Sequence, residues 1–156
     1  EVFNMAKYNY RKDVKEMLAK VKKSFTGKNG KVYEYQFDEV FPESKKTQFI
    51  KDFIAIKQEC DTNKETPNYD FIYEYLIVKH FTDVIPSYKG TPYEICVYGI
   101  DTIKDVIEIG IYEEILMALN QNEIKKLNTY FKDGLKAMQK ILDDYILNNK
   151  EVLQNG

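Results

Sequence analysis

The chain has 156 residues, of which 44% are hydrophobic and 31% are charged, and its formal net charge is −2. This length suits one domain of roughly 100–200 residues, which can bury a core without disulfides or metals, and the composition argues against a disordered chain. The most apolar stretch, Phe71–Phe81, contains Glu74 and Lys79 and falls short of the ~18–20 apolar residues of a membrane span. We therefore expect a single domain over residues 1–156 that has no membrane partner.

Two further features favour a reducing, cytoplasmic environment. The N-terminal residues lack the basic, apolar and small-residue succession of a secretion signal. Cys60 and Cys96 have no second cysteine or histidine at a ligand spacing, so we expect two reduced and buried thiols, with a disulfide between them as the alternative. Met5-Ala6-Lys7 is typical of a natural translation start, and we expect residues 1–4 to be an addition to the natural chain.

Charge is unevenly distributed along the sequence. The segment Lys7–Lys31 holds nine basic residues against two acidic ones, whereas residues 32–156 carry a net charge of −8. Lysine outnumbers arginine 22 to 1, and isoleucine, asparagine and tyrosine are abundant, as in proteins encoded by AT-rich genomes. We therefore expect the source to be a low-GC bacterium or one of its phages.

The first predicted elements are a helix and a strand. From Arg11 the apolar residues follow a helical spacing of three or four, and they are Val14, Met17, Leu18, Val21 and Phe25. The residues Gly27-Lys28-Asn29-Gly30 predict a tight turn, and Lys31–Phe37 alternates like a half-buried strand, with Tyr33, Tyr35 and Phe37 on one face. Its partner stays open between an antiparallel leg at Ser24–Gly27 and an unwound end of the helix.

Four helices are predicted in the middle of the chain. Ser44 is expected to cap the first, which follows Pro42 and runs to Cys60, and Asn68 to cap the second, which we expect to be the core helix. After a loop at Thr82–Gly90, Thr91-Pro92-Tyr93-Glu94 resembles a capping box, and the helix that it opens is expected to break at Gly99 and end at Gly110. A short helix over Tyr112–Leu119 follows.

The clearest pattern is the last one. Asn120 and Glu123 are expected to cap a long amphipathic helix to about Asn148, whose apolar residues recur at gaps of three or four: Ile124, Leu127, Phe131, Leu135, Met138, Leu142 and Tyr145. Such a helix would span about 42 Å at 1.5 Å per residue, well beyond the ~15 Å radius of gyration of a domain of this size. It must therefore bend, protrude or pair with another chain, and Gly134 is the expected point of a bend or of a close contact.

No constellation of residues predicts catalysis, a metal or a cofactor. His80 is the only histidine and sits in an apolar helix, where packing explains it better than ligation. The neighbouring carboxylates Glu113-Glu114 and Asp143-Asp144 are about 100° apart on a helix and cannot share a substrate. Gly27 and Gly30 lack the surroundings of a phosphate-binding loop. We therefore expect a protein that is not an enzyme.

Surface residues for a partner are predicted in three places. Lys12, Lys15 and Lys22 lie in the basic segment, Tyr33 and Tyr35 alternate along the strand, and the long helix contributes Phe131, Met138 and Tyr145. Tyrosine is enriched where proteins meet, and clustered lysines attract an acidic partner. The same lysines could meet phosphates, but the near absence of arginine makes nucleic acid the less favoured partner.

Two stretches carry a family resemblance. Phe71–Val84 (FIYEYLIVKHFTDV) and Ile103–Leu119 (IKDVIEIGIYEEILMAL) resemble small helical proteins encoded by phages or prophages of low-GC Gram-positive bacteria. In those proteins an aromatic-rich helix ends in Phe-Thr-Asp or Phe-Thr-Asn, and a Leu/Ile-x-x-Gly-x-x-x-x-Ile pattern precedes a long C-terminal helix. The resemblance covers about a third of the chain and matches Phe81, Thr82, Asp83 and Gly110 as fold positions. It implies a virion-assembly role in the host cytoplasm, first of all that of a tail-assembly chaperone.

Together these observations predict a mainly α, single-domain fold of five to seven helices with a small β-element near residues 31–37. The expected function is that of a non-enzymatic protein-binding factor, whose partner could be a phage structural protein or further copies of itself. The alternative is a nucleic-acid-binding regulator that uses the basic N-terminal helix.

Overall fold

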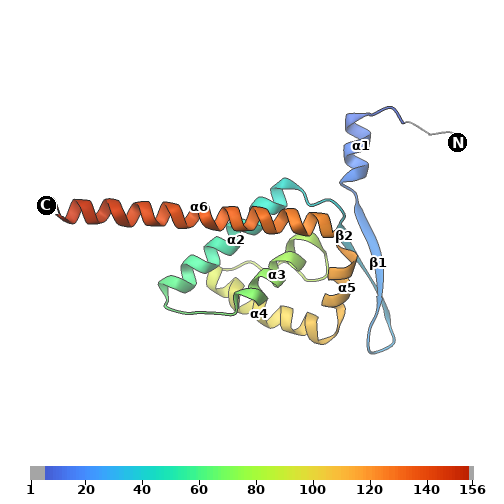
Figure 1. Cartoon of the computed structure of the whole chain (residues 1–156). Helices are drawn as coiled ribbons and strands as arrows, with labels where there is room; N and C mark the ends of the chain where they lie inside the picture. Colours follow the sequence, from blue (N-terminus) through green and yellow to red (C-terminus); the bar gives the residue numbers. More distant parts are fainter. Residues whose placement is uncertain (1–5, 155–156) are drawn as a thin grey trace. The chain divides into compact units, whose positions relative to one another are not determined.

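The computed structural model describes residues 6–154, with side chains described for residues 6–150; the expected start at Met5 lies outside this range. The described residues form six helices and two strands, which confirms the mainly α prediction (Figure 1). They divide into two compact units, the first ending at Asn120 and the second beginning at Gln121. Among the helices of the described residues, none has the length and apolar character needed to cross a membrane.

The N-terminal segment forms a short helix and a β-hairpin, whose elements are α1 (Tyr10–Met17), β1 (Lys20–Thr26) and β2 (Val32–Asp38). The predicted helix is therefore wrong beyond Met17. Val21 and Phe25 are four residues apart, a spacing that places two side chains on one face of a helix and equally on one face of a strand. Residues Lys20–Thr26 form a strand and not a helix because they pair with β2 in antiparallel fashion, with Val21 opposite Phe37 and Phe25 opposite Tyr33.

The predicted turn and strand are confirmed. The Gly27 amide donates to the Lys31 carbonyl at 2.8 Å, and Gly30 has a φ of +78°, a conformation that glycine adopts without steric cost. On β2, Tyr35 and Phe37 are buried as the alternation predicts, whereas Tyr33 stays exposed near the tip of the hairpin. The hairpin thus has one apolar face that packs against the rest of the first unit.

The core of the first unit is helical, and its elements are α2 (Glu43–Thr62), α3 (Tyr69–Phe81), α4 (Pro92–Glu108) and α5 (Ile111–Ala118). As predicted, α3 is the core helix: it packs against α2 and α4, and Tyr75, Leu76, Val78 and Phe81 are fully buried. Full burial of one large apolar side chain contributes about 1.5–3 kcal/mol, so these residues account for much of the stability. Phe81 also stacks on Phe41 with ring centroids 3.9 Å apart.

Two helices begin with the predicted caps. The Asn68 side chain accepts from the amides of Asp70 and Phe71, and the Thr91 hydroxyl accepts from the Glu94 amide at 3.2 Å. Ser44 is not a cap. Pro42 occupies the cap position and its carbonyl accepts from the Lys46 amide, so α2 starts at Glu43, before Ser44 can act.

The predicted break at Gly99 is absent, and the last helix is likewise continuous at Gly134. α4 continues through Gly99. The glycine serves packing instead, because it lets the Tyr75 ring of α3 approach the α4 backbone: a Cβ at residue 99 would lie 2.6 Å from Tyr75 Cδ1. α6 (Gln121–Gln154), the whole helical part of the second unit, continues through Gly134 and is drawn without a kink in Figure 1. One glycine lowers helix propensity by about 1 kcal/mol, which neighbouring residues of high propensity offset. The predicted end at Gly110 is confirmed, since this residue has a φ of +84°.

Candidate functional site

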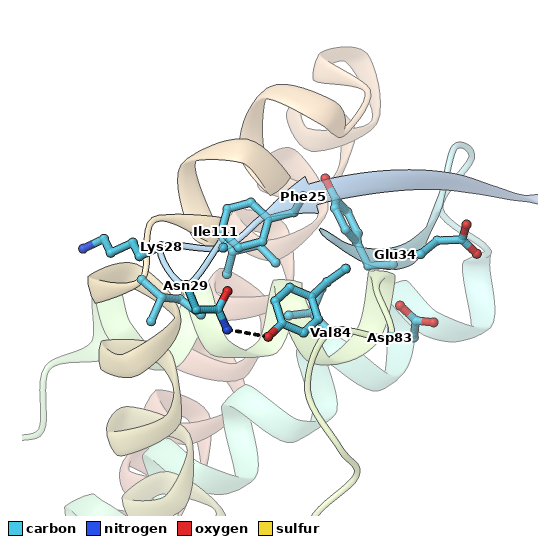
Figure 2. A pocket seen from close by; sticks show the side chains of 11 residues that line it. Phe25, Lys28, Asn29, Glu34, Asp83, Val84 and Ile111 are labelled. Atoms are coloured by element: carbon cyan, nitrogen blue, oxygen red, sulfur yellow. Dashed lines mark hydrogen bonds between the residues drawn. The ribbon is translucent and has the colours of Figure 1, made fainter. Parts of the chain in front are cut away.

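A pocket of about 550 Å³ lies in the first unit where the hairpin meets the helical core (Figure 2). Three segments line it. The hairpin contributes Phe25, Gly27, Lys28, Asn29, Tyr33, Glu34 and Tyr35; the residues after α3 contribute Asp83 and Val84; and the α4–α5 junction contributes Ile109 and Ile111. Because these segments are far apart in the sequence, the pocket depends on the complete fold of the unit.

The interior of the pocket is apolar and aromatic. Phe25, Tyr35 and Ile111 are each less than 9% exposed, whereas Tyr33 and Ile109 are 47% and 49% exposed at its mouth. Burial, together with the negative charge of Glu114, raises the pKa of Tyr35, so this hydroxyl stays neutral at physiological pH. A surface of this kind suits an apolar or aromatic group.

Polar groups lie around this apolar interior. Figure 2 shows the carboxylates of Glu34 and Asp83 together at one end of the pocket and the Lys28 side chain pointing away at the other. Lys28 donates from Nζ to the carbonyl of Glu108 at 3.1 Å, which ties the hairpin tip to the end of α4. Asn29 Nδ2 donates to the Tyr33 hydroxyl at 2.7 Å and fixes that ring at the mouth.

The chain itself occupies part of the outer edge of β2. Phe37 forms an isolated antiparallel bridge with Thr82, the Asp83 amide donates to the Gln36 carbonyl at 3.1 Å, and the Gln36 amide donates to Asp83 Oδ1 at 2.7 Å. Residues 82 and 83 therefore take part of this edge without extending into a strand. The chain then turns into the loop at Val84, which lines the pocket.

A second feature is the basic arm, which we define as α1 and β1, residues Tyr10–Thr26. None of the α1 residues is buried; Tyr10 is 70% and Met17 is 54% exposed. The helix start is set locally, because the Asn9 side chain accepts from the Lys12 amide and Asp13 accepts from the Asn9 amide. Cationic and apolar side chains are thus presented together on α1, none of whose residues is buried by the rest of the unit.

The structure places the predicted partner residues in three separate regions. Tyr33 and Tyr35 line the pocket, although Tyr35 is only 4% exposed and offers little surface of its own. Lys12, Lys15 and Lys22 are exposed on the basic arm, with Lys22 Nζ 3.9 Å from Glu34 Oε1 on β2. Phe131, Met138 and Tyr145 lie on α6 in the second unit.

Of the eleven residues that line the pocket, only Tyr33 and Tyr35 were among the predicted site residues. Four of the others lie outside the hairpin: Asp83, Val84, Ile109 and Ile111. They come from the end of α3 and from both sides of Gly110, and only the three-dimensional packing brings them to the hairpin. The sequence does carry one signal, since Phe81-Thr82-Asp83 and Gly110 are the positions that mark the family resemblance. That signal predicts fold positions and does not indicate a pocket.

His80 has a carboxylate partner that the sequence did not predict. His80 Nε2 lies 2.8 Å from Asp52 Oδ2, and Asp52 also pairs with Lys79 at 3.6 Å and accepts from Gln48. Burial opposes ionisation of Asp52, but the hydrogen bonds from His80 and Gln48 and the charges of His80 and Lys79 outweigh it and lower the pKa of this carboxyl. Neither His80 nor Asp52 lines the pocket, and the pair joins α2 to α3.

The two cysteines face each other across α2 and α4. Cys60 and Cys96 are free and buried, with their sulfurs 4.0 Å apart. Burial, with the neighbouring Cys60, raises the pKa of Cys96 to about 12, so the thiol is protonated and unreactive. The predicted burial of both thiols is confirmed. Among the described residues, no group of three or more histidine, cysteine or acidic side chains could hold a metal ion.

Comparison with known proteins gives one match. The family model described as YomO matches residues 9–156, which is nearly the whole chain. No curated protein and no solved structure matches the chain.

Proposed function

The chain belongs to the YomO family, named after a protein of a Bacillus prophage, and we propose that this phage-associated protein is a non-enzymatic factor that binds a protein partner in the host cytoplasm. The proposal extends to a role in virion assembly, in which the partner is a phage structural protein. A tail-assembly chaperone is one such factor.

The observation that carries the proposal is the exposed basic arm. An isolated helix shorter than ~12–15 residues is marginal in water, yet α1 has eight residues, none of them buried. The local caps specify where this helix begins, and the half-buried Val14, the exposed Met17 and the exposed cap residue Leu18 give it an apolar side. Such an element gains most of its stability when a partner covers that side.

Charge favours an acidic protein as that partner. Lys7–Lys31 carries a net charge of +7, and Lys12, Lys15 and Lys22 are all exposed. Complementary charge mainly speeds encounter and selects partners, while the apolar and aromatic surface supplies affinity. The arm contains both kinds of group, and Tyr10 and Met17 would be among the side chains that a partner buries.

The rival function is nucleic-acid binding through the same lysines. Arg11 is the only arginine of the chain, so forked contacts to phosphate or guanine have almost no donor. The rival predicts steep salt dependence: six or more phosphate contacts weaken binding by about 10³-fold or more between 50 and 200 mM salt. Titration of the chain with labelled single-stranded and double-stranded DNA at these salts separates the two functions.

We also propose that α6 pairs with α6 of a second copy. Apolar residues recur on this helix every seven positions, at Ile124, Phe131, Met138 and Tyr145. Ile141 is 70% and Tyr145 64% exposed, and exposed apolar side chains that gather on one face of a helix mark interaction sites. A self-associating stripe of this kind would let the protein cover a long partner with several copies.

The experiment that tests the main proposal is pairwise co-expression with phage structural proteins. Each is tested for complex formation with the wild-type chain and with the triple variant Lys12→Glu, Lys15→Glu, Lys22→Glu. We expect one protein to bind the wild type and to bind the triple variant about tenfold or more weakly. The matched control Lys51→Glu, Lys64→Glu, Lys89→Glu changes the net charge equally at exposed lysines outside the arm and should bind like the wild type. Equal loss in both triple variants would overturn the role of the arm.

A further inference from the structure

The open part of the β2 edge lies beside the pocket. In an antiparallel pair, the backbone groups of successive residues point alternately toward and away from the partner strand. Gly27 bonds Lys31 across the turn, and the register then places Tyr33 and Tyr35 in the hydrogen-bonded positions facing β1. Gln36 faces the other way, as its two bonds with Asp83 show. Glu34, two residues earlier, therefore directs its amide and carbonyl to the same outer edge.

Part of this edge is taken by an isolated bridge, which does not extend into a strand. Thr82 and Asp83 pair with Phe37 and Gln36, and the chain leaves the edge at Val84. The next outward-facing backbone groups along this edge, past those of Gln36, are thus those of Glu34. Edge groups of this kind pair readily with an added strand. The pocket lies directly beside this position, since Glu34, Asp83 and Val84 all line it.

We propose that this edge and pocket form a binding site for an extended peptide segment of a partner protein, which adds to β2 as a third strand beside the bridge that Thr82 forms. The inference gives the partner's chemistry and so rests on the proposed protein-binding function. Main-chain bonds to Glu34 hold the peptide, and one of its bulky apolar side chains enters the pocket between Phe25, Tyr35 and Ile111.

The lining defines the peptide further. Side chains alternate along a strand, so the residues on either side of the apolar one point away from the pocket and can be polar. The carboxylates of Glu34 and Asp83 lie together at one end (Figure 2), and a lysine or arginine of the peptide is favoured there. We therefore expect a peptide that has a basic residue at the end near the two carboxylates, followed by residues that alternate between apolar and polar. The exposed ring of Tyr33 would cover the bound side chain at the mouth.

Two proline variants separate this edge from the hairpin itself. Glu34→Pro removes the outward amide of β2, which the hairpin ladder does not use, and proline is tolerated on edge strands for that reason. Ser24 is the cross-strand partner of Glu34, and its amide points to the opposite outer edge of the hairpin. Ser24→Pro is therefore the matched control: it places the same ring in the same pair and leaves the proposed site intact.

The test uses a displayed library of random dodecapeptides, selected on the immobilised full chain. We expect enriched peptides with alternating apolar residues that bind Ser24→Pro like the wild type and Glu34→Pro at least about tenfold more weakly. Val84→Glu, which places a carboxylate in the apolar wall, should weaken the same peptides without touching the edge. Amide chemical shifts of the bound chain should change at Glu34, Val84 and Ile111.

Three results would overturn the inference: no enrichment over a blank surface, equal binding to Glu34→Pro and wild type, or shift changes confined to α1 or α6. The proposed function is tested separately by the lysine variants in co-expression. A partner that binds through the basic arm and ignores Glu34→Pro would leave the proposed function standing and remove the peptide site.

Discussion

At Gly99 the absence of a side chain decides how closely α3 and α4 approach. The Tyr75 ring fills the space where a Cβ would project, at 2.6 Å from the nearest ring atom. Tyr75 is fully buried and also meets Tyr98 edge to face, with ring centroids 6.1 Å apart, so the ring cannot move away without disturbing the core. The sequence shows a glycine inside a helical pattern, which predicted a break, and only the neighbouring helix explains its presence.

Gly99→Ala should therefore destabilise the protein, although alanine is the better helix former. The helix-propensity gain of about 1 kcal/mol is outweighed by the cost of overpacking, and we expect the free energy of unfolding to fall by about 1–3 kcal/mol. Urea titration followed by circular dichroism measures this change. Thr102→Ala on the same helix changes propensity without the contact and should be neutral or slightly stabilising; an equal gain from Gly99→Ala would contradict the packing account.

The Asp52 cluster predicts a pH dependence of stability. Because the folded-state pKa of Asp52 is lowered, its contribution is present above the unfolded value near 3.8 and is lost as the pH falls through the folded pKa. Asp52→Asn should lower the free energy of unfolding by about 1–3 kcal/mol near neutral pH, because His80 and Lys79 lose a charged partner. The difference between wild type and variant should shrink below about pH 4.

Urea titrations of both proteins between about pH 6 and pH 3 test this expectation. Asp101→Asn, at an exposed position of α4, is the control and should show no such convergence. A constant difference between wild type and Asp52→Asn over the whole range would show that Asp52 contributes through its shape and not through its charge.

Among the helices and strands, those that are buried in the core are predicted best from the sequence. The burial of α3 follows from its lack of a polar face, and its start follows from the Asn68 cap. Val21 and Phe25 fit both the helical and the strand period, so only Ser24–Gly27 was considered as an antiparallel leg, whereas the strand begins at Lys20. Pairing with β2, which lies across a turn, determines this. Ser44 failed as a cap because the adjacent Pro42 already defines the helix start. Local patterns thus fix an element only where no neighbour competes.

The candidate site could be predicted only in part, for the same reason. Tyr33 and Tyr35 follow from the alternation of one strand, and both line the pocket. Val84 and Ile111 follow from no pattern, because their place in the pocket depends on where α3 ends and on how the chain turns at Gly110. Long-range packing of this kind leaves no period in the sequence.

At the scale of elements, α1 should be the least stable helix of the first unit. It has eight residues, and none of them is buried, whereas six residues of α3 are buried. Hydrogen exchange of the free protein should show almost no protection for the amides of α1 and protection close to the global free energy of unfolding for α3. Equal protection of the two helices would mean that α1 is held by contacts stronger than its exposure indicates.

In the whole molecule, two different surfaces are available for association: the basic arm and the apolar stripe of α6. The basic arm lies in the first unit and the apolar stripe on α6 in the second. Association through the arm depends partly on charge and association through the stripe on apolar contacts, so the two respond differently to salt. Exposed charges are screened strongly above about 0.1 M salt, whereas apolar contacts are not.

We predict that the chain self-associates through α6 to the same extent at about 100 and 500 mM salt. Light scattering coupled to size exclusion measures the mass directly. Ile141→Lys with Tyr145→Lys should give a monomer, while Thr129→Lys with Gln139→Lys adds the same charge elsewhere on the helix and should not. A wild-type monomer at both salts would remove α6 as a self-association surface.

Binding of a protein partner at the basic arm can be tested by hydrogen exchange of the complex. The wild-type chain is compared alone and with the phage structural protein that co-expression identifies. We expect the amides of Tyr10–Met17 to exchange freely in the unbound chain and to gain protection of about tenfold or more in the complex, because the partner covers the helix. Unchanged exchange over α1, with protection appearing only elsewhere in the described residues, would contradict it.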